Sequence, residues 1–392
     1  MGWPEAVWPA AGALVLTFFG LLAHSAALRG IAQGTDVYLF LAGMMLLTEL
    51  AREEGLFDWL AAYAARMARG SPGRLFGLIY LVGVLVTVFL SNDATAVVLT
   101  PAVAAVTRAA GADNRLPFLL ICAFVANAAS FVLPISNPAN LVLYDGHMPP
   151  LAQWLPRFAL PSLLSIAGTW GVLRFTQRRA LAGRLRREIA RPPLSAGGKT
   201  AAAGIAGMAA LLLVVSGLGL RLGLPTFCSA AVTLAALWIP RRRIPWPVLK
   251  QVSWSVLPLV AGLFVLVQAL AQTGALARLA ALIQSLARVN PAGALWAGGI
   301  VLGYACNLVN NLPAGLAAGE AAGGLPHRVA AAILLGVDIG PNLSVTGSLA
   351  TILWLAALRR ENIAVTAWQF LKLGFLAMPA ALLPALLGLF FS

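Results

Sequence analysis

Charged residues are scarce in this sequence, and their scarcity excludes a soluble globular fold. Of the 392 residues only 10% are charged and 60% are hydrophobic, whereas roughly a quarter of the residues of a soluble domain are charged. Apolar stretches near the ~20 residues that a helix needs to cross the bilayer recur along the chain, among them Val7–Leu28, Ala201–Leu220 and Val365–Phe391. The sequence therefore predicts an all-α polytopic membrane protein.

Cysteine is rare, and no nucleotide-binding motif is present. Cys122, Cys228 and Cys306 are far apart in apolar surroundings and form no CxxC pair, so we expect neither a disulfide framework nor a metal site. The sequence has no Walker motif, so we expect no ATP hydrolysis, no other enzyme activity and no cofactor. Cys306 stays a minor candidate for contact with a thiophilic solute, since buried membrane cysteines more often pack.

The net charge of +14 does not indicate a nucleic-acid partner. The basic residues concentrate in two connections between apolar stretches, the pattern of loops on the cytoplasmic side of a membrane. We therefore expect the anionic inner leaflet to be their neighbour. The first connection carries Arg174, Arg178, Arg179, Arg184, Arg186, Arg187, Arg191 and Lys199, and the second carries Arg241, Arg242, Arg243 and Lys250.

An internal repeat organises the chain. A shift of 219 positions, found by sliding the sequence along itself, superimposes landmark residues without a gap, and a shift of 210 positions aligns Leu133–Tyr144 with Leu343–Trp354. We expect a first repeat over residues 1–175, a basic connector with one extra span over 176–222, and a second repeat over 223–392. The landmarks are Gly43 with Gly262, Gly55 with Gly274, Pro72 with Pro291, and Ser91-Asn92 with Asn310-Asn311.

Each repeat contains two interruptions within apolar sequence. The halves around Asn92 and Asn311 are short and have no charged loop between them, which predicts re-entrant hairpins at about 74–108 and 292–325. Broken helices are expected at about 116–146 and 327–358. If both basic connections are cytoplasmic, the two hairpins enter from opposite sides, so the repeats have inverted topology, as in many secondary transporters.

Irregular backbone at membrane depth is tolerated where it is buried or lines a cavity, so we expect the four interruptions to form one binding site. Their polar side chains are the candidate substrate ligands, although each could instead cap its own half-helix or, for the hydroxyls, bond its own backbone. These candidates are Asn92, Asn137, Asn310, Asn311, Asn342, Ser91, Thr95, Ser136 and Thr346.

Three acids are candidates for proton coupling, because an ionisable residue inside the membrane is costly and functional by default. Asp93 lies at the first hairpin tip and ranks first, and Asp338 lies at the second break. Glu49 ends a span beside Arg52 and could equally form an interfacial ion pair. No Lys or Arg occurs in Leu75–Thr107 or Val289–Pro326, which favours a neutral or cationic substrate.

Four segments carry a family resemblance: VFLSNDATAVVLTPAV, ISNPANLV, NNLPAGL and GVDIGPNLSVTGSLATILWL. They resemble the bacterial arsenite/antimonite efflux permeases of the ion-transporter superfamily. The resemblance implies export of As(OH)3 or Sb(OH)3 in exchange for protons, a place in the bacterial inner membrane, and a soluble arsenite-stimulated ATPase subunit as a candidate partner. A sodium- or proton-coupled cation antiporter, an organic-anion carrier of the same superfamily and a passive metalloid channel remain alternatives.

Overall fold

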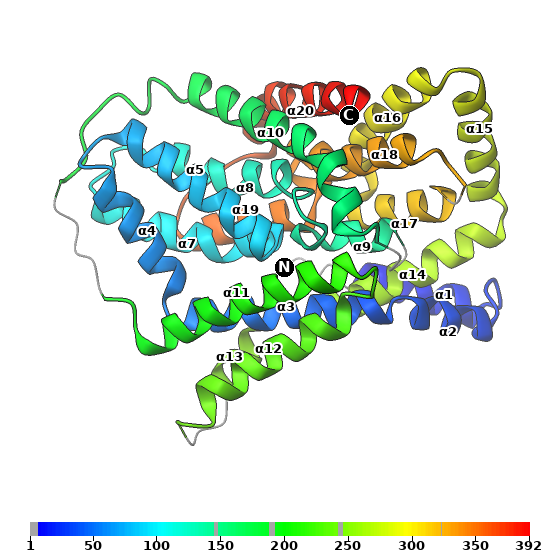
Figure 1. The fold of residues 1–392 in the computed structure, drawn as a ribbon, viewed down its shortest axis with the longest axis horizontal. Helices are drawn as coiled ribbons and strands as arrows, with labels where there is room; N and C mark the ends of the chain where they lie inside the picture. Colours follow the sequence, from blue (N-terminus) through cyan, green and yellow to red (C-terminus); the bar gives the residue numbers. More distant parts are fainter. Residues whose placement is uncertain (1–6, 145–147, 188–192, 242–245, 323) are drawn as a thin grey trace.

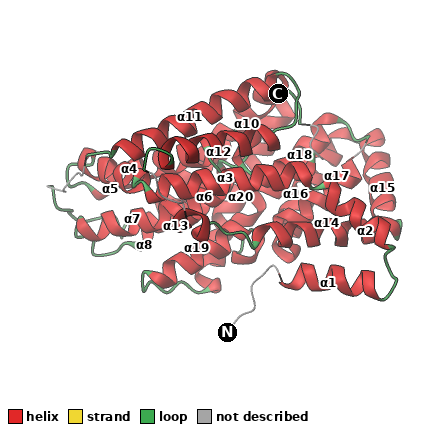
Figure 2. Cartoon of the chain, turned by 90° about the horizontal axis from the view of Figure 1, so that it is seen from below, coloured by secondary structure: helices red, strands yellow, loops and turns green. Residues whose placement is uncertain are grey.

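The computed structural model describes residues 7–144, 148–187, 193–241, 246–322 and 324–392. Every regular element in these ranges is helical (Figure 2), so the predicted all-α fold is confirmed. Arg191, Arg242 and Arg243 of the basic connections, and the last two positions of the predicted 116–146 segment, lie outside the described residues.

Several helices have the length and composition of membrane spans. Five are long and apolar enough by themselves, and two bent pairs bring the number to as many as seven in the described part of the chain. The first pair joins α2 (His24–Gln33) to α3 (Thr35–Glu53) at 46°, and the second joins α14 (Val256–Gln272) to α15 (Ala275–Val289) at 73°. The five are α5 (Pro72–Phe89), α10 (Leu151–Thr176), α11 (Ala196–Gly217), α16 (Pro291–Val309) and α20 (Ala367–Phe391).

The two inverted repeats contain corresponding elements in the same order, except that α6 and α7 of the first correspond to the single helix α17 of the second, and α11 lies between the repeats. The first repeat consists of α2, α3, α5 and α10 together with α1 (Val7–Phe18), α4 (Leu56–Met67), α6 (Asn92–Ala94), α7 (Thr100–Ala109), α8 (Leu116–Ala128) and α9 (Pro138–Leu143). The second repeat consists of α14, α15, α16 and α20 together with α12 (Gly223–Trp238), α13 (Trp246–Gln251), α17 (Asn311–Ala322), α18 (His327–Ile339) and α19 (Leu349–Arg360).

Two of the repeated glycines form equivalent turns. Gly55 between α3 and α4 has φ 73°, and Gly274 between α14 and α15 has φ 74°. Both values lie in the left-handed region, which glycine adopts without the steric cost that a Cβ atom would add. The repeated landmark therefore marks the place where each repeat turns from a span into its amphipathic helix.

The other repeated glycines allow the repeats to exchange their first helices. α12 of the second repeat packs along α3 of the first, and α1 of the first packs along α14 of the second (Figure 1). A Cβ atom at Gly43 would lie 2.8 Å from the backbone of Thr226, and one at Gly262 would lie 2.7 Å from the carbonyl carbon of Pro9. Each helix crossing is thus close enough to require glycine.

The hairpins begin at the repeated prolines and reverse at the repeated polar pairs. Pro72 and Pro291 occupy the first turns of α5 and α16, where proline is well tolerated. At 18 and 19 residues these arms are longer than the sequence suggested, because the helices already begin at the two prolines. The first hairpin returns through a π-helical turn, Thr95–Leu99, whereas the second returns through the regular helix α17.

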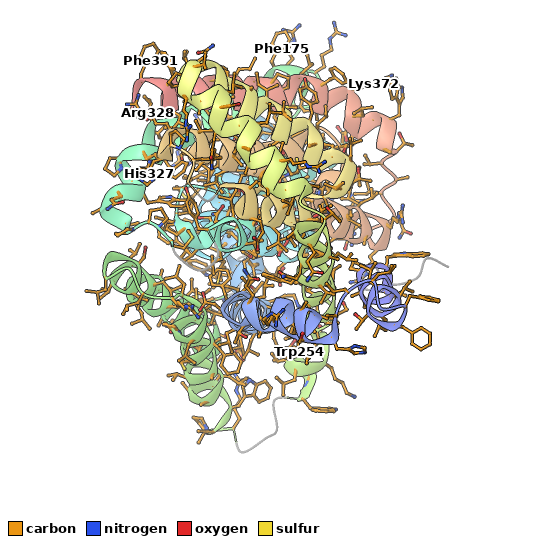
Figure 3. All side chains as sticks on the ribbon, turned by 90° about the vertical axis from the view of Figure 1, so that its right-hand side faces the viewer. Phe175, Trp254, His327, Arg328, Lys372 and Phe391 are labelled. Carbon is orange, nitrogen blue, oxygen red and sulfur yellow. The ribbon has the colours of Figure 1, made fainter. Side chains whose placement is uncertain are left out.

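Both broken helices are interrupted by short 3-10 turns. In the first, Pro134–Ser136 separates α8 from α9, and in the second, Gly340–Asn342 and Val345–Gly347 separate α18 from α19. At the far end of α18, the Arg328 guanidinium donates to the carbonyl of Ser392, and Figure 3 shows Arg328 and His327 on the same side as Phe391.

Basic residues from separate segments gather where α3, α7 and α19 end. The backbone N–H of Leu185 donates to Gly70 O at 3.0 Å, and that of Arg186 donates to Ala110 O at 2.9 Å. These bonds dock the first basic connection on the ends of α4 and α7. Arg241 of the second connection donates to Glu54 at 2.9 Å, and Arg108 pairs with Glu361.

Candidate functional site

The four interruptions of the two repeats meet at one cavity. We call it the tip cavity. Because the N-terminal ends of α6, α9, α17 and α19 all reach it, it is a place where free N–H groups and partial positive charge concentrate. Its lining comprises Asn92 and Asp93, Asn137 and Pro138, Asn311 and Leu312, Ser348, Leu349 and Ala350, with Leu41 and Val256.

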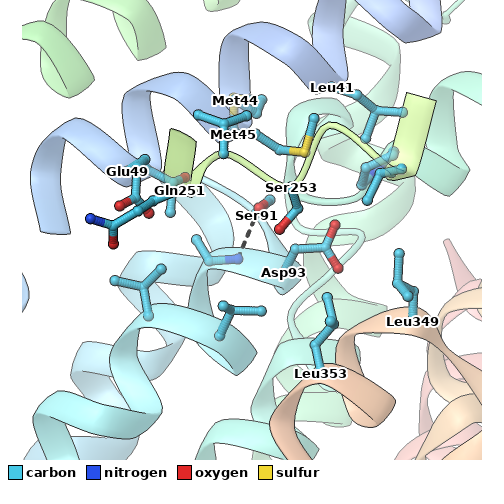
Figure 4. A pocket seen from close by; sticks show the side chains of 17 residues that line it. Leu41, Met44, Met45, Glu49, Ser91, Asp93, Gln251, Ser253, Leu349 and Leu353 are labelled. Carbon is cyan, nitrogen blue, oxygen red and sulfur yellow. Dashed lines mark hydrogen bonds between the residues drawn. The ribbon is translucent and has the colours of Figure 1, made fainter. Parts of the chain in front are cut away.

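A larger cavity adjoins the tip cavity on the side where α3 ends. This Asp93 cavity holds about 630 Å³ and extends from Asp93 to Glu49 and Gln251 (Figure 4). The two cavities share five lining residues and are therefore adjacent, and we refer to them together as the recess. The shared residues are Leu41, Asp93, Pro138, Val256 and Leu349.

Asp93 is the acid at the junction of the two cavities, whereas Glu49 lines only the larger one. The Asp93 side chain is half-buried and lines both cavities, and Figure 4 shows the carboxylate pointing into the space toward Ser253. No lysine or arginine is among the described residues that line either cavity. An acid in such surroundings must be solvated, protonated or stabilised by the helix N-termini to remain there.

Ser91 and Asn92 cap the hairpin tip as well as lining the recess. Ser91 Oγ accepts a hydrogen bond from the N–H of Ala94 at 3.1 Å, and Asn92 Oδ1 accepts one from the N–H of Asp93 at 2.9 Å. The amide nitrogen of Asn92 is free of these bonds and remains available as a donor. Capping and cavity lining therefore coexist at these two residues, and their role as substrate ligands stays a prediction.

Asp338 is placed differently from Asp93, because its carboxyl group is sealed inside the protein. The side chain is 0% exposed and lines neither cavity. The Asn137 amide donates to Asp338 Oδ1 at 2.7 Å, and Oδ2 has no hydrogen-bond partner among the described residues.

The hydrogen-bonded pair Asn137 and Asp338 has a pseudo-symmetric equivalent, formed by Ser348 and Asn127. Asn127 occupies the position in α8 that Asp338 occupies in α18, and Ser348, which caps α19, donates to Asn127 Oδ1 at 3.4 Å. Asn127 also donates to Asn342 Oδ1 at 3.1 Å. In both pairs, the residue that caps a half-helix of one repeat donates a hydrogen bond to a side chain of the other repeat.

Other candidate ligands make internal hydrogen bonds away from the recess. Thr95 pairs with Thr87 at 2.8 Å between their hydroxyl oxygens, and Ser136 donates to the carbonyl of Val88 at 3.1 Å. Asn310 donates to the carbonyl of Thr346 at 3.3 Å, and both residues line a separate cavity of about 690 Å³. The structure thus brings Asn92, Asn137 and Asn311 together in the tip cavity.

Glu49 forms the ion pair that the sequence offered as an alternative to proton coupling, and Cys306 is a packing residue. Glu49 accepts bonds from Arg52 Nε at 2.9 and 3.0 Å, and Arg52 also donates to Gln251. Cys306 is buried beside Gly340, with Sγ 3.4 Å from the carbonyl of Gly303, and it lines neither cavity.

A third cavity, at the opposite end of α3, is a pseudo-symmetric counterpart of the Asp93 cavity. This Asp36 cavity holds about 570 Å³ and is lined by Asp36, Arg221 and Phe264, among others. The shift of 219 positions relates four of its lining residues to the Asp93 cavity, namely Ala32 to Gln251, Gln33 to Val252, Val37 to Val256, and Phe264 to Met45. Related cavities thus lie at both ends of α3, as expected of inverted repeats.

Sequence reasoning missed Asn127, Ser348 and Gln251. Asn127 is the one amide within the apolar run Leu116–Leu133, and a polar residue inside such a run was a usable signal. Ser348 could have been found from its alignment near Asn137. Gln251 gave no signal, because it reaches Arg52 only through the tertiary fold.

The comparisons with known proteins agree with this geometry. The family model CitMHS, described as citrate transporter, matches residues 3–337. The arsenical pump membrane proteins of Yersinia enterocolitica and of Escherichia coli K12 are 27% and 26% identical, each over 85% of this chain and 81% of its own length. The crystal structure of the Alcanivorax borkumensis YdaH transporter has a TM-score of 0.58 at 17% identity, and the match covers 98% of this chain and 96% of that one.

Proposed function

We propose, from the premise that this chain belongs to the citrate transporter family CitMHS, that it is a secondary exporter of trivalent metalloid. It is a multi-pass membrane transporter, and we place it in the bacterial inner membrane. The substrate is As(OH)3 or Sb(OH)3, which leaves the cell in exchange for protons.

The observation that carries this proposal is Asp93 at the junction of two cavities that no described basic residue lines. A small neutral hydroxide needs hydrogen-bond donors and acceptors but no countercharge. The amides of Asn92, Asn137 and Asn311 can supply both, and the Asp93 carboxylate can accept from a hydroxyl. The arsenical pump names of two relatives support the same substrate class.

Proton coupling follows from the same residue. A neutral solute gains nothing from the membrane potential, so uphill export requires a second, charged species. Asp93 can carry that proton if metalloid and proton exclude one another in the recess. Asp338 serves less well, because it lines neither cavity, and Glu49 is already paired with Arg52.

An organic anion such as citrate is the second candidate. The four helix N-termini around the tip cavity favour negative charge, and the family is named for citrate. A tricarboxylate, however, would meet the Asp93 carboxylate without a lysine or arginine in the described lining. We therefore rank this candidate below the neutral metalloid.

The test is uptake of arsenite, antimonite and citrate into everted membrane vesicles with and without an imposed pH gradient. We expect both metalloids to accumulate and the pH gradient to drive them. Asp93→Asn should abolish that accumulation but keep downhill exchange, because the amide resembles a protonated acid. Glu49→Gln is the matched control and should still accumulate metalloid.

The contrary outcomes are distinct. Citrate uptake without metalloid uptake would establish the second candidate. Metalloid accumulation by Asp93→Asn would remove Asp93 from the coupling mechanism and leave Asp338 as the next residue to test. Stimulation of uptake by ATP and a soluble subunit would add a partner, for which the docked basic connection around Leu185 is the surface we propose.

A further inference from the structure

Sulfur atoms line the Asp93 cavity, although none of them belongs to a cysteine. The lining includes Met44 and Met45, which are consecutive in α3. Figure 4 shows both side chains on the α3 wall, across the recess from the hairpin tip that carries Asp93. In the described part of the chain, no other methionine and no cysteine lines the Asp93, tip or Asp36 cavity.

Packing alone does not require sulfur at these positions. Methionine commonly fills irregular gaps in a core, and Met44 is 3% exposed. Both side chains, however, line the Asp93 cavity. The equivalent positions in α14, 219 residues later, are the hydrocarbons Leu263 and Phe264, so this fold packs the same helix surface without sulfur.

The neighbours of the two thioethers are hydrogen-bonding groups. Thr48, Ser91, Asp93 and Ser253 line the same cavity, and Figure 4 shows Ser91, Asp93 and Ser253 facing the space below α3. The recess therefore combines oxygen groups that suit hydroxyls with polarisable sulfur atoms that suit a soft central atom. A solute with both features at once is a trivalent hydroxide of arsenic or antimony.

We propose that Met44 and Met45 are specificity-determining residues, whose sulfur lone pairs contact the metalloid atom while the oxygen groups bind its hydroxyls. This inference rests on the proposed function. The contact is non-covalent: the three metalloid–oxygen bonds stay intact and no proton moves. Antimony is larger and more polarisable than arsenic, so the thioethers favour Sb(OH)3 over As(OH)3.

The experiment compares the wild-type protein with Met44→Leu, Met45→Leu and the double variant in everted vesicles, measuring KM and kcat for each metalloid. Leucine keeps nearly the same volume, and such exchanges usually cost little stability. In the double variant we expect the KM for antimonite to rise about tenfold, which corresponds to ~1.4 kcal/mol, and the KM for arsenite to rise less. Met208→Leu, at a buried position of α11, is the control and should change neither constant.

A second measurement needs no substitution. Selenium is a softer donor than sulfur, so wild-type protein grown with selenomethionine should have a lower KM for antimonite. Unchanged KM values, or equal loss for both metalloids in the double variant, would overturn the selectivity role while leaving metalloid export intact. Failure of the wild-type protein to move either metalloid would instead overturn the proposed function, and this inference with it.

Discussion

The Asn137 amide donates a hydrogen bond to Asp338 Oδ1 over 2.7 Å. This bond joins the N-terminal end of α9, the second half of the first broken helix, to the C-terminal end of α18, the first half of the second broken helix. Its counterpart is the 3.4 Å bond from Ser348 to Asn127. Because both bonds cross between repeats, the two broken helices are coupled at the centre of the fold.

Loss of the Asn137 side chain should destabilise the folded protein. Asn137→Ala leaves the buried Asp338 carboxyl without its donor, at a cost of about 1–3 kcal/mol. The measurement is thermal unfolding in detergent. Ser348→Ala removes the longer and weaker counterpart and should lower the melting temperature less. Equal stability of Asn137→Ala and the wild-type protein would show that Asp338 finds another partner.

The exchanged helices should depend on their crossing glycines. Gly43→Ala places a Cβ atom 2.8 Å from the Thr226 backbone, so α3 and α12 must separate, at a cost of about 1–3 kcal/mol. Gly77→Ala is the control, because a Cβ atom there meets nothing within 4 Å. We expect a lower melting temperature for Gly43→Ala and an unchanged melting temperature for Gly77→Ala. A stable Gly43→Ala protein would contradict the close crossing.

Two neighbouring asparagines at the second hairpin tip should have different roles. Asn311 lines the tip cavity, so Asn311→Ala should weaken transport while the protein stays folded. Asn310 has a φ of 76°, which glycine tolerates, so Asn310→Gly removes its side chain without strain and should transport normally. Initial rates of metalloid uptake measure both. Normal transport by Asn311→Ala would make Asn311 a structural residue only.

The two related cavities should open to opposite sides of the membrane. In a protein whose three cysteines are replaced, Thr48→Cys of the Asp93 cavity should react with a membrane-impermeant thiol reagent from the cytoplasmic side. Ala32→Cys of the Asp36 cavity should react from the periplasmic side. Mass spectrometry of intact cells and everted vesicles gives the result. Labelling of both from one side would contradict the orientation that the basic connections predict.

The sequence predicted the frame of the fold because its landmarks have local physical causes. Gly55 and Gly274 occupy left-handed turns, and Pro72 and Pro291 begin the hairpin arms. Each requirement lies within a few residues of chain, so the same residue type recurs at the same offset.

The contacts between repeats could not be predicted in the same way. The exchange of α1 and α12 depends on which helices meet in three dimensions, and no local pattern records it. The sealed position of Asp338 and the open position of Asp93 likewise follow from tertiary packing, since both are single acids in apolar sequence. For the candidate site, the sequence identified the converging residues but not which of them face the recess.

The exchange of first helices has a consequence for biosynthesis. α1 (Val7–Phe18) leaves the ribosome well before its partner α14, which begins only at Val256. At typical elongation rates, the first helix waits on the order of 10 to 50 s before the surface that it covers has been made. During that interval lipid or the insertion machinery must shield it. The packing of α1 is therefore completed only after α14 of the second repeat has been translated.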